Sequence, residues 1–420
     1  VVIPGITTMT RDALRETGLD NKSVTKCKNM FALGICFYLF DRPEAYAFKY
    51  IETKFAKKNP AIAEANKLAI QAGYNYAANT HQFANTYTVA PAPLEKGTYR
   101  SISGNVATAW GLCAAAEKAG LPLFCGSYPI TPATVILEEL AKRKDLGVKT
   151  VQAEDEIAGI CTAIGAAFAG NFAVTTTSGP GLSLKSEALG LAVMTELPLV
   201  VVDVQRGGPS TGLPTKTEQS DLAQALYGRN GECPVIVVAA SSPSDCFHYA
   251  FEAGRLAMEH MTPVILLTDG FIANGSEPWR IPAMKDYPAI TPPIVDEAPE
   301  GGFMPYVRNE NLARGWAFPG KTGLEHRVGG LEKDCVKGCI SHDPSNHQKM
   351  VRTRAEKVAK AVDDIPAQAV WGAPEGDLLV VGWGGTRGHL QNAVDQMRAE
   401  GKRVSLCHFN YINPLPHGVR

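Results

Sequence analysis

Apolar residues recur at helical spacing through the first part of the chain. Between Pro43 and Ala78 they fall three or four positions apart, at Ala47, Tyr50, Ile51 and Phe55 and then at Ile62, Ala65, Leu68 and Ala69. The pattern is interrupted at Asn59-Pro60, where proline ends one helix or begins another. Residues 1–88 are therefore predicted to be helical.

The longest unbroken apolar run is FALGICFYLF, residues 31–40. A membrane-spanning helix needs about 20 such residues, so this run is too short. It ends in Asp41-Arg42-Pro43-Glu44 without a small-residue cleavage site, which argues against a signal peptide. The run predicts a buried helix.

From about residue 100, short apolar segments alternate with helical ones. Successive X-Pro pairs favour extended backbone just before this point, so residues 89–99 are predicted to be a linker. Strands are expected at 150–153, 172–176, 197–204, 235–239 and 264–267, and helices at 155–169, 184–195 and 244–258. Buried strands separated by helices predict an α/β domain over residues 100–275, with a parallel sheet covered on both faces. Catalytic groups are expected in the loops that follow the strands.

Residues 275–350 are rich in proline and glycine and contain few periodic runs. The stretch is too long for an ordinary loop, so residues 276–366 are interpreted as a linker or a docking arm wrapped on a partner. A second α/β unit is predicted for residues 367–420, with strands at 378–383 and 403–409 around a helix at 388–399. The chain begins Val1-Val2 without an initiator methionine and stops directly after a strand, so a longer polypeptide is expected.

Charge and cysteine content exclude some classes of function. The 41 basic and 42 acidic residues give a formal charge of −1, which provides no electrostatic reason to expect nucleic acid or a membrane as partner. None of the ten cysteines forms a CxxC motif, so the usual iron–sulfur ligand runs are absent. Because disulfide frameworks belong to small secreted domains, a reducing cytoplasm is expected.

Two weaker motifs carry no assigned chemistry. Cys335 and Cys339 have His342 and His347 nearby, but their spacing fits no common zinc pattern, and no metal site is expected. The glycines of GWGGTRG, residues 382–388, are not in GxGxxG spacing, and no acidic residue ends the next strand. A plain strand-to-helix turn is therefore preferred to a dinucleotide site.

Four motifs could form a binding site. In GSYPITPAT, prolines stiffen a bend that presents Tyr128 and Thr131, either to a substrate or merely to cap the next helix. In QAEDEIAGI, acidic residues open a helix that is apolar and small all round and hence expected to be buried. These acids either interact favourably with the helix dipole or provide a buried carboxyl for a ligand.

Two further motifs follow predicted strands. TTTSGPGLSL places a Gly-Pro-Gly turn between a strand and a helix, which suits close approach of a ligand. Arg206 ends the apolar strand before QRGGPSTGLPT, and a guanidinium at that position can bind a carboxylate bidentately. Surface arginines after strands are also common, so both interpretations stay open.

Taken together, YPITP, QAEDEIA, TSGPGLSL, MTELPLVVVDVQRGGPSTGLPT and GWGGT resemble the α subunits of 2-oxoacid:ferredoxin oxidoreductases, from about Gly104 to the end. The closest similarity is to the 2-oxoglutarate branch. Residues 1–88 resemble the C-terminal part of the γ-type domain fused to many such subunits. The resemblance implies a thiamine diphosphate-binding fold, with its pyrimidine domain at 100–275, followed by the start of a transketolase C-terminal-like domain at 367–420.

The resemblance also implies roles for residues. The family's activating glutamate falls on Glu156, whose carboxyl would bond the aminopyrimidine ring and favour its imino tautomer. The implied catalytic residues are Glu156, Thr131 and Arg206. Substrate contacts are expected from Thr131, Arg206, Thr215 and Tyr128, and cofactor contacts from Glu156, Pro129, Ile130, Ser178 and Gly179.

The resemblance also implies partners, and the motifs that the chain lacks agree with it. The pyrophosphate-binding GDG…N magnesium motif is missing, because Thr268-Asp269-Gly270 is not followed by the asparagine-bearing segment. In such enzymes a β subunit supplies Mg²⁺ and a [4Fe-4S] cluster, coenzyme A takes the acyl group and ferredoxin takes the electrons. The alternatives are the same class acting on pyruvate or branched-chain 2-oxoacids, a non-oxidative thiamine-dependent decarboxylase, and a structural or regulatory subunit without catalysis.

Overall fold

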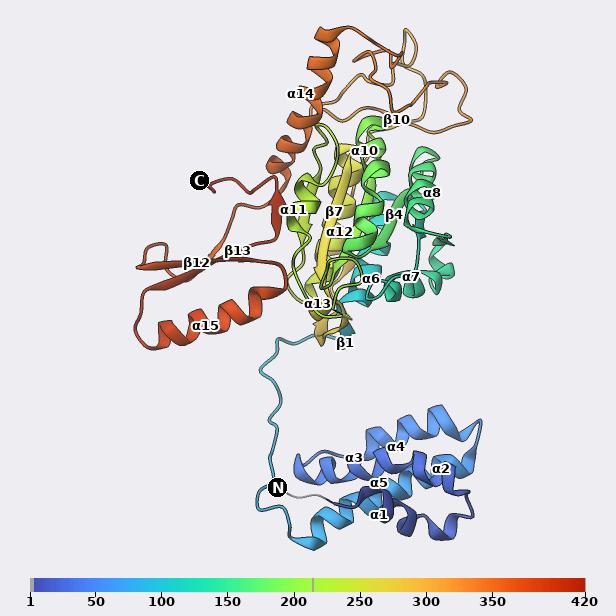
Figure 1. Cartoon of the computed structure of the whole chain (residues 1–420), viewed down its shortest axis with the longest axis vertical. Helices are drawn as coiled ribbons and strands as arrows, with labels where there is room; N and C mark the ends of the chain where they lie inside the picture. The colour runs from blue at the N-terminus through green and yellow to red at the C-terminus, as the bar shows by residue number, and fades with distance from the viewer. Residues whose placement is uncertain (1–3, 214, 420) are drawn as a thin grey trace. The chain divides into compact units, whose positions relative to one another are not determined.

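The computed structural model describes residues 4–213 and 215–419 of the 420-residue chain. The chain divides into two compact units, Val1–Lys96 and Gly97–Arg420 (Figure 1). The boundary falls in the segment that the X-Pro pairs predict to be a linker.

The first unit is helical up to Thr80, as predicted, whereas residues 81–88, which were also predicted to be helical, form no helix. Its α-helices are α1 (Ile6–Ala13), α2 (Asn21–Lys26), α3 (Lys28–Leu39), α4 (Ala45–Ile51) and α5 (Pro60–Thr80). Helix α5 begins at the predicted break, where Asn59 Oδ1 accepts a hydrogen bond from the Ile62 N–H at 3.2 Å. Helices α3 and α5 pack closely, since a β-carbon at Gly34 would lie 2.7 Å from the Tyr74 nitrogen.

The apolar run at residues 31–40 is not buried all round, contrary to the prediction. It lies in α3 and at its C-terminal end, where Phe31 and Ile35 are buried, whereas Phe40 is 42% exposed. In a small helical unit each helix is covered on one side, so only one face of the run is buried. No helix within the described residues is both long and apolar enough to cross a bilayer.

A seven-stranded sheet forms the centre of the second unit, in the order β14-β6-β7-β5-β4-β2-β3. Its strands are β2 (Leu123–Ser127), β3 (Lys149–Gln152), β4 (Phe172–Thr177), β5 (Leu199–Gln205), β6 (Ile236–Ala239), β7 (Pro263–Asp269) and β14 (Tyr411–Asn413). All pairs are parallel except β14 with β6. The predicted parallel sheet is thus confirmed, with an antiparallel edge strand added from the end of the described chain.

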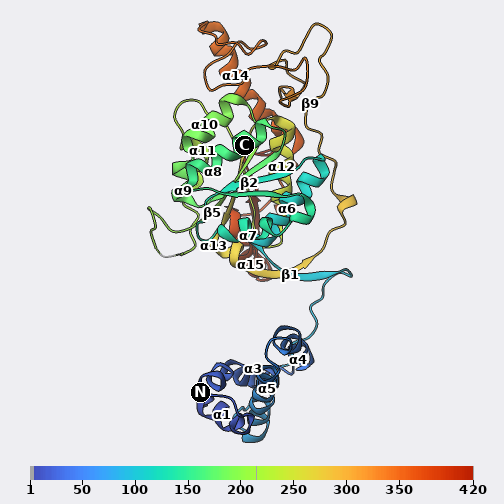
Figure 2. The ribbon, with the colours of Figure 1, turned by 90° about the vertical axis from the view of Figure 1, so that its right-hand side faces the viewer.

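Helices cover both faces of this sheet (Figure 2). Val200 and Val202 of β5 pack into one core cluster, and Leu199 and Val201 pack into the other. The first cluster draws on α6 (Gly104–Ala119), α7 (Thr134–Ala141) and α12 (Asp245–His260), the second on α8 (Glu156–Phe168), α9 (Gly179–Leu184), α10 (Ser186–Thr195) and α11 (Leu222–Tyr227). Burial on both faces explains the continuous apolar strands.

The segment 276–366, predicted to be a linker or docking arm, lies against the α/β domain of its own chain (Figure 1). It contains β8 (Ser276–Arg280), paired with β1 (Tyr99–Ser103), then β9 (Ile294–Val295), β10 (Trp316–Ala317) and α14 (Pro344–Lys360). Trp316 is fully buried, and its Nε1–H donates to the Ala167 carbonyl at 3.0 Å. The Cys335–Cys339 turn belongs to this segment, and no three His, Cys, Asp or Glu side chains of the described residues are grouped to hold a metal.

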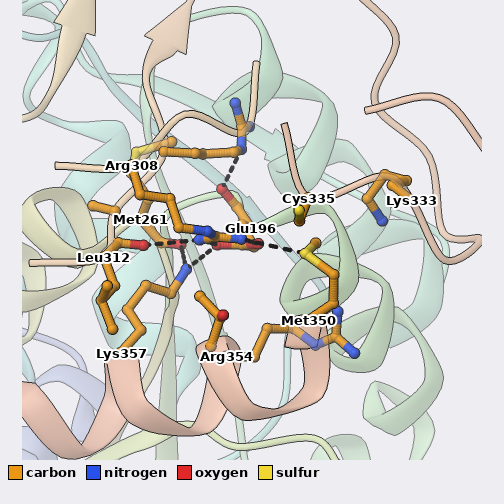
Figure 3. Close-up of polar contacts among 12 residues, drawn as sticks. Glu196, Met261, Arg308, Leu312, Lys333, Cys335, Met350, Arg354 and Lys357 are labelled. Carbon is orange, nitrogen blue, oxygen red and sulfur yellow. Dashed lines mark hydrogen bonds and ion pairs between the residues drawn. The ribbon is translucent and has the colours of Figure 1, made fainter. Parts of the chain in front are cut away.

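Buried charges attach this segment to the end of α10 (Figure 3). Glu196 accepts two hydrogen bonds from Arg308 at 2.6 Å and one from the Lys357 ammonium at 2.5 Å. Burial opposes ionisation, but Lys357 and Arg308 still hold the pKa of Glu196 well below its ordinary value. Burial lowers the pKa of Lys357 to about 8, against the attraction of Glu196. A buried ion cluster of this kind fixes one arrangement of the segment.

The last described part contains a three-stranded sheet, in the order β11-β13-β12, with one helix. Its elements are β11 (Val370–Trp371), β12 (Leu378–Trp383), α15 (Arg387–Ala399) and β13 (Val404–Phe409). GWGGTRG forms the turn from β12 into α15, as predicted. Gln219 Nε2 donates to the Trp383 carbonyl at 3.3 Å, which connects this turn to the loop after β5.

Candidate functional site

The four candidate motifs meet at one edge of the seven-stranded sheet. They follow β2, β3, β4 and β5, which the order β5-β4-β2-β3 makes neighbours. These strands are parallel, so their carboxyl ends lie along the same edge. The loops that begin at Tyr128, Ala153, Ser178 and Arg206 are therefore brought together, as the rule for parallel sheets predicts.

The three acids of QAEDEIA are in different environments. Asp155 is the N-cap of α8, and its Oδ1 accepts from the Ala158 N–H at 2.7 Å. Glu154 is exposed to solvent, whereas Glu156, the first residue of the helix, is 8% exposed. Helix capping thus explains Asp155. It does not explain the buried Glu156 carboxyl, which is therefore a candidate ligand-binding group.

Glu156 packs against the Gly-Pro-Gly turn after β4. A β-carbon at Gly181 would lie 2.7 Å from Glu156 Cγ and 3.2 Å from its Oε1, and it would overlap the Thr177 hydroxyl. Glycine is required here because of this close approach. Within the described chain, no donor is hydrogen-bonded to the Glu156 carboxyl. A nearly buried acceptor is therefore available to a ligand that can donate.

Lys185 is a site residue that sequence reasoning missed. Its ammonium donates to the Glu156 backbone carbonyl at 2.7 Å and to Thr175 Oγ1 at 3.1 Å, and the residue is fully buried. Burial lowers its pKa to about 8, against the attraction of Glu156. The signal was a single lysine within the apolar stretch GLSLKSEALGLAV, where a buried cation needs a specific partner. Lys185 also separates α9 from α10, whereas sequence analysis predicts a turn at Gly179-Pro180-Gly181 and one helix at 184–195.

Arg206 connects the loop after β5 with the bend after β2. Its Nη1 donates to the Thr131 backbone carbonyl at 2.7 Å, so two of the predicted substrate residues are in contact. The contact uses the Thr131 carbonyl, which leaves the threonine hydroxyl exposed. Arg206 Nε is buried without a partner among the described residues. The guanidinium therefore retains donors for an anion.

The remaining predicted site residues differ in how far they are buried. Thr215 is exposed in the loop between β5 and α11, with a φ of 52°, and it lies beside Pro214, which is outside the described residues. Tyr128 is 37% exposed, and Pro129 and Ile130 are half-buried. Ser178 is fully buried, and its Oγ has no partner among the described residues.

The prediction that α8 is buried all round is wrong. Ile157 is 47% exposed and Cys161 is also exposed, because α8 presents one face away from the sheet. Four further exposed apolar side chains belong to β3, to α9 or to the loops after β2 and β5, namely Val151 (38%), Leu184 (51%), Tyr128 (37%) and Leu213 (62%). Exposed apolar side chains gathered around a site are typical of an interaction surface.

Comparison with known proteins yields a consistent set of relatives. Residues 115–340 match the family model described as pyruvate flavodoxin/ferredoxin oxidoreductase, thiamine diphosphate-binding. The 2-oxoglutarate oxidoreductase subunit KorA of Mycobacterium tuberculosis is 53% identical over 98% of this chain and 62% of that protein. The 2-oxoglutarate synthase subunit KorA of Methanothermobacter marburgensis is 36% identical over 75% of this chain and 82% of that protein.

A solved structure has the same fold over nearly the whole chain. It is the 2-oxoglutarate:ferredoxin oxidoreductase of Magnetococcus marinus, solved with 2-oxoglutarate, coenzyme A and succinyl-CoA bound. The match has a TM-score of 0.87 at 35% identity and covers 97% of this chain and 69% of that one. The chain thus spans 62% of the Mycobacterium tuberculosis relative, 82% of the Methanothermobacter marburgensis relative and 69% of the solved chain.

Proposed function

The chain belongs to the family of 2-oxoacid:ferredoxin oxidoreductase α subunits, and from that premise we propose that it contributes the thiamine-pyrimidine site of an enzyme acting on 2-oxoglutarate. The complete enzyme converts 2-oxoglutarate and coenzyme A to the acyl-CoA and CO₂, or catalyses the reverse reaction, and exchanges electrons with ferredoxin. The observation that carries this proposal is the nearly buried Glu156 carboxyl beside Gly181 at the carboxyl edge of the sheet.

The residues around Glu156 fit the pyrimidine end of thiamine diphosphate. Glu156 offers a carboxyl acceptor to a protonated ring nitrogen, and the glycines at 179 and 181 keep the turn narrow. The buried Ser178 Oγ, which lacks a protein partner among the described residues, provides a further polar contact. When bound, the cofactor supplies the electron sink for decarboxylation of the 2-oxoacid.

Glu156 acts by holding a proton at the pyrimidine ring. Burial strengthens a hydrogen bond between this carboxyl and a ring donor, because the local dielectric is low. Lys185 fixes the first turn of α8 through the Glu156 carbonyl, so the carboxyl has a defined direction. A fixed acceptor needs little reorganisation during turnover.

The substrate is bound at the neighbouring loops. Arg206 has a guanidinium suited to a carboxylate, and its contact with the Thr131 carbonyl orients it toward the bend after β2. In this proposal Thr131 and Thr215, which are both exposed, donate hydrogen bonds to the 2-oxoacid. Preference for 2-oxoglutarate is proposed because two relatives bear that substrate in their names.

A β subunit completes the site, in our proposal, by supplying Mg²⁺, the pyrophosphate contacts and the iron–sulfur cluster. Asp269, the acid of the Thr268-Asp269-Gly270 string, is already engaged as the N-cap of α13 (Gly270–Asn274). Its Oδ1 accepts from the N–H groups of Phe271 and Ile272 at 2.8 and 3.2 Å. The exposed apolar side chains of Ile157 and Leu184 provide a surface for this subunit.

The test is to purify the assembled enzyme and supply a panel of 2-oxoacids. We expect a brown complex with a second, cluster-bearing chain that reduces ferredoxin fastest with 2-oxoglutarate and requires coenzyme A. A clear preference for pyruvate would contradict the substrate assignment. Turnover that needs neither ferredoxin nor coenzyme A would indicate a non-oxidative decarboxylase instead.

A further inference from the structure

Two carboxyl groups face each other at the base of the loop that carries Arg206. Asp203 lies on β5 and is fully buried, and Asp221 is 8% exposed at the N-cap of α11. Residues 206–220 form the loop between them. Neither Asp203 oxygen, nor Oδ2 of Asp221, has a hydrogen-bond donor among the described residues. The group that meets the Asp203 carboxyl is the carboxyl of Asp221.

Within the described part of the chain, no positive charge acts on either carboxyl of the pair. Asp221 also lies against α9, since a β-carbon at Gly179 would be 2.6 Å from both of its carboxyl oxygens. Beside Asp203, β4 contributes the uncharged Thr177. Glu218, on the loop itself, is the further charged group acting on Asp221, and it repels a negative charge. Lys185, at the end of α9, is directed to Glu156 and Thr175.

Two buried carboxylates without a cation repel each other and lose their hydration. A single proton removes both penalties, because one carboxyl then donates a hydrogen bond to the other. Burial, and next the negative charge of Asp221, raise the pKa of Asp203 well above its ordinary value. Burial also raises the pKa of Asp221, although the hydrogen bond from Asp203 opposes this. The proton therefore resides on Asp203 and is donated to Asp221.

The pair closes the base of the loop. Asp221 is tied to the same strand a second time, because its N–H donates to Gln205 Oε1 at 3.2 Å. Farther out, the Gly207 N–H donates to the Lys216 carbonyl at 2.7 Å. Arg206 thus begins a loop whose two ends are joined by the acid pair and by Gln205.

We propose that Asp203 and Asp221 share one proton and, by joining the two ends of the loop 206–220, position Arg206 for the 2-oxoacid. The positioning role rests on the proposed function of Arg206, whereas the shared proton does not. Ionisation of the pair separates the two carboxyls and loosens the loop. Neither residue touches the substrate, so both are positioning residues.

The test compares Asp203→Asn with the unaltered protein in the assembled enzyme. An amide at position 203 donates to the Asp221 carboxylate at any pH, so it reproduces the protonated pair. One pH unit above the pH at which the pair loses its shared proton, only about a tenth of the enzyme molecules still hold that proton. We therefore expect the KM for 2-oxoglutarate of the unaltered enzyme to rise about tenfold at that pH. In Asp203→Asn the KM stays level over the same range, and kcat changes little in either protein.

A second readout does not depend on catalysis. Lys216 is exposed within the loop, so trypsin cleavage after Lys216 reports how often the loop opens. At alkaline pH, cleavage is expected to be faster in the unaltered protein than in Asp203→Asn, and Asp203→Leu, which cannot donate, is cleaved fastest at every pH. Asp364→Asn, which alters a remote carboxylate paired with His260, serves as the control that leaves cleavage unchanged.

The outcomes separate the two proposals. Equal pH dependence of both KM and cleavage in the unaltered protein and Asp203→Asn overturns the shared proton. Altered cleavage with an unaltered KM overturns the positioning of Arg206 alone. If the enzyme does not turn over 2-oxoacids, the proposed function fails, and trypsin cleavage still decides whether the pair holds the loop.

Discussion

Gly181 lies so close to Glu156 that a single β-carbon on the glycine would come within 2.7 Å of the glutamate Cγ. The turn after β4 therefore packs tightly against the first residue of α8. The central residue of the site is held by packing as well as by its own helix.

Gly181→Ala is expected to lower kcat by about 10–100-fold, because the added methyl displaces the Glu156 carboxyl from its direction. Gly190→Ala is the matched control, since a β-carbon at Gly190 in α10 would meet nothing within 4 Å. Steady-state kinetics of the assembled enzyme measure the effect. Equal activity of the two variants would contradict the proposed direction of Glu156.

Lys185→Met tests the buried cation beneath Glu156. Burial lowers the pKa of Lys185 from 10.5 to about 8, so the unfolded chain binds more protons than the folded one between these values. The folded state is therefore destabilised by this lysine below about pH 8, and the penalty disappears as pH rises toward 10.5. The full difference corresponds to about 3 kcal/mol at 1.36 kcal/mol per pH unit.

Unfolding measured across this range should show the unaltered protein gaining stability relative to Lys185→Met as pH rises. Because the side chain also holds the Glu156 carbonyl, the variant is expected to lose activity at all pH values. A stability difference that does not change with pH would argue against a buried, titrating ammonium.

Glu196→Gln tests what attaches the segment 276–366. Removing one partner of a buried ion cluster leaves Arg308 and Lys357 uncompensated, and the expected loss is about 3–5 kcal/mol of unfolding free energy. Since the pKa of Glu196 is held below 4.5, its contribution is present above that pH and is lost on acidification below it. Denaturant unfolding across acidic pH measures both effects.

Asp296→Asn is the control for this variant, because Asp296 forms an exposed ion pair with Lys321 in the same segment. Its expected cost is below about 1 kcal/mol. Similar losses for both variants would show that the Glu196 cluster is not what holds the segment.

Arg206→Lys tests the substrate assignment. Lysine keeps the charge but loses the planar fork that can hold both a carboxylate and the Thr131 carbonyl. The KM for 2-oxoglutarate is expected to rise about 10–100-fold, while kcat falls less. Arg352→Lys, at an exposed position on α14, is the neutral control. An unchanged KM would exclude Arg206 as the charge partner.

Sequence patterns predicted the architecture well for the strands that are buried on both faces of the sheet. The apolar run at 197–204 became β5, and the motifs after β2 to β5 meet at one edge because parallel strands must end together. Strand β14 was missed because it is three residues long and pairs with β6, far away in sequence. The local spacing of apolar residues gives no information about pairing between strands that are far apart in the sequence.

Site chemistry was predictable in part. Glu156 and Arg206 were singled out by their motifs and by the family resemblance, and their roles stay predictions. Residue spacing alone did not separate the helix cap, Asp155, from the buried acid beside it. Lys185 and Asp203 were missed because each is a single charged residue within an apolar run. In the sequence such a residue only breaks the hydrophobic pattern and indicates no partner. Their significance depends on what faces them across the fold, namely the Glu156 carbonyl and Asp221.

The most direct test of the central claim is the turnover of Glu156→Gln in the assembled enzyme, with Glu154→Gln as control for the exposed neighbouring acid. Glutamine keeps the size of the side chain but lacks the carboxylate that, in our proposal, holds a proton at the pyrimidine ring. We predict that Glu156→Gln assembles normally and loses about 10²–10⁴-fold in kcat, while Glu154→Gln keeps its activity. Unchanged turnover in Glu156→Gln would contradict the account.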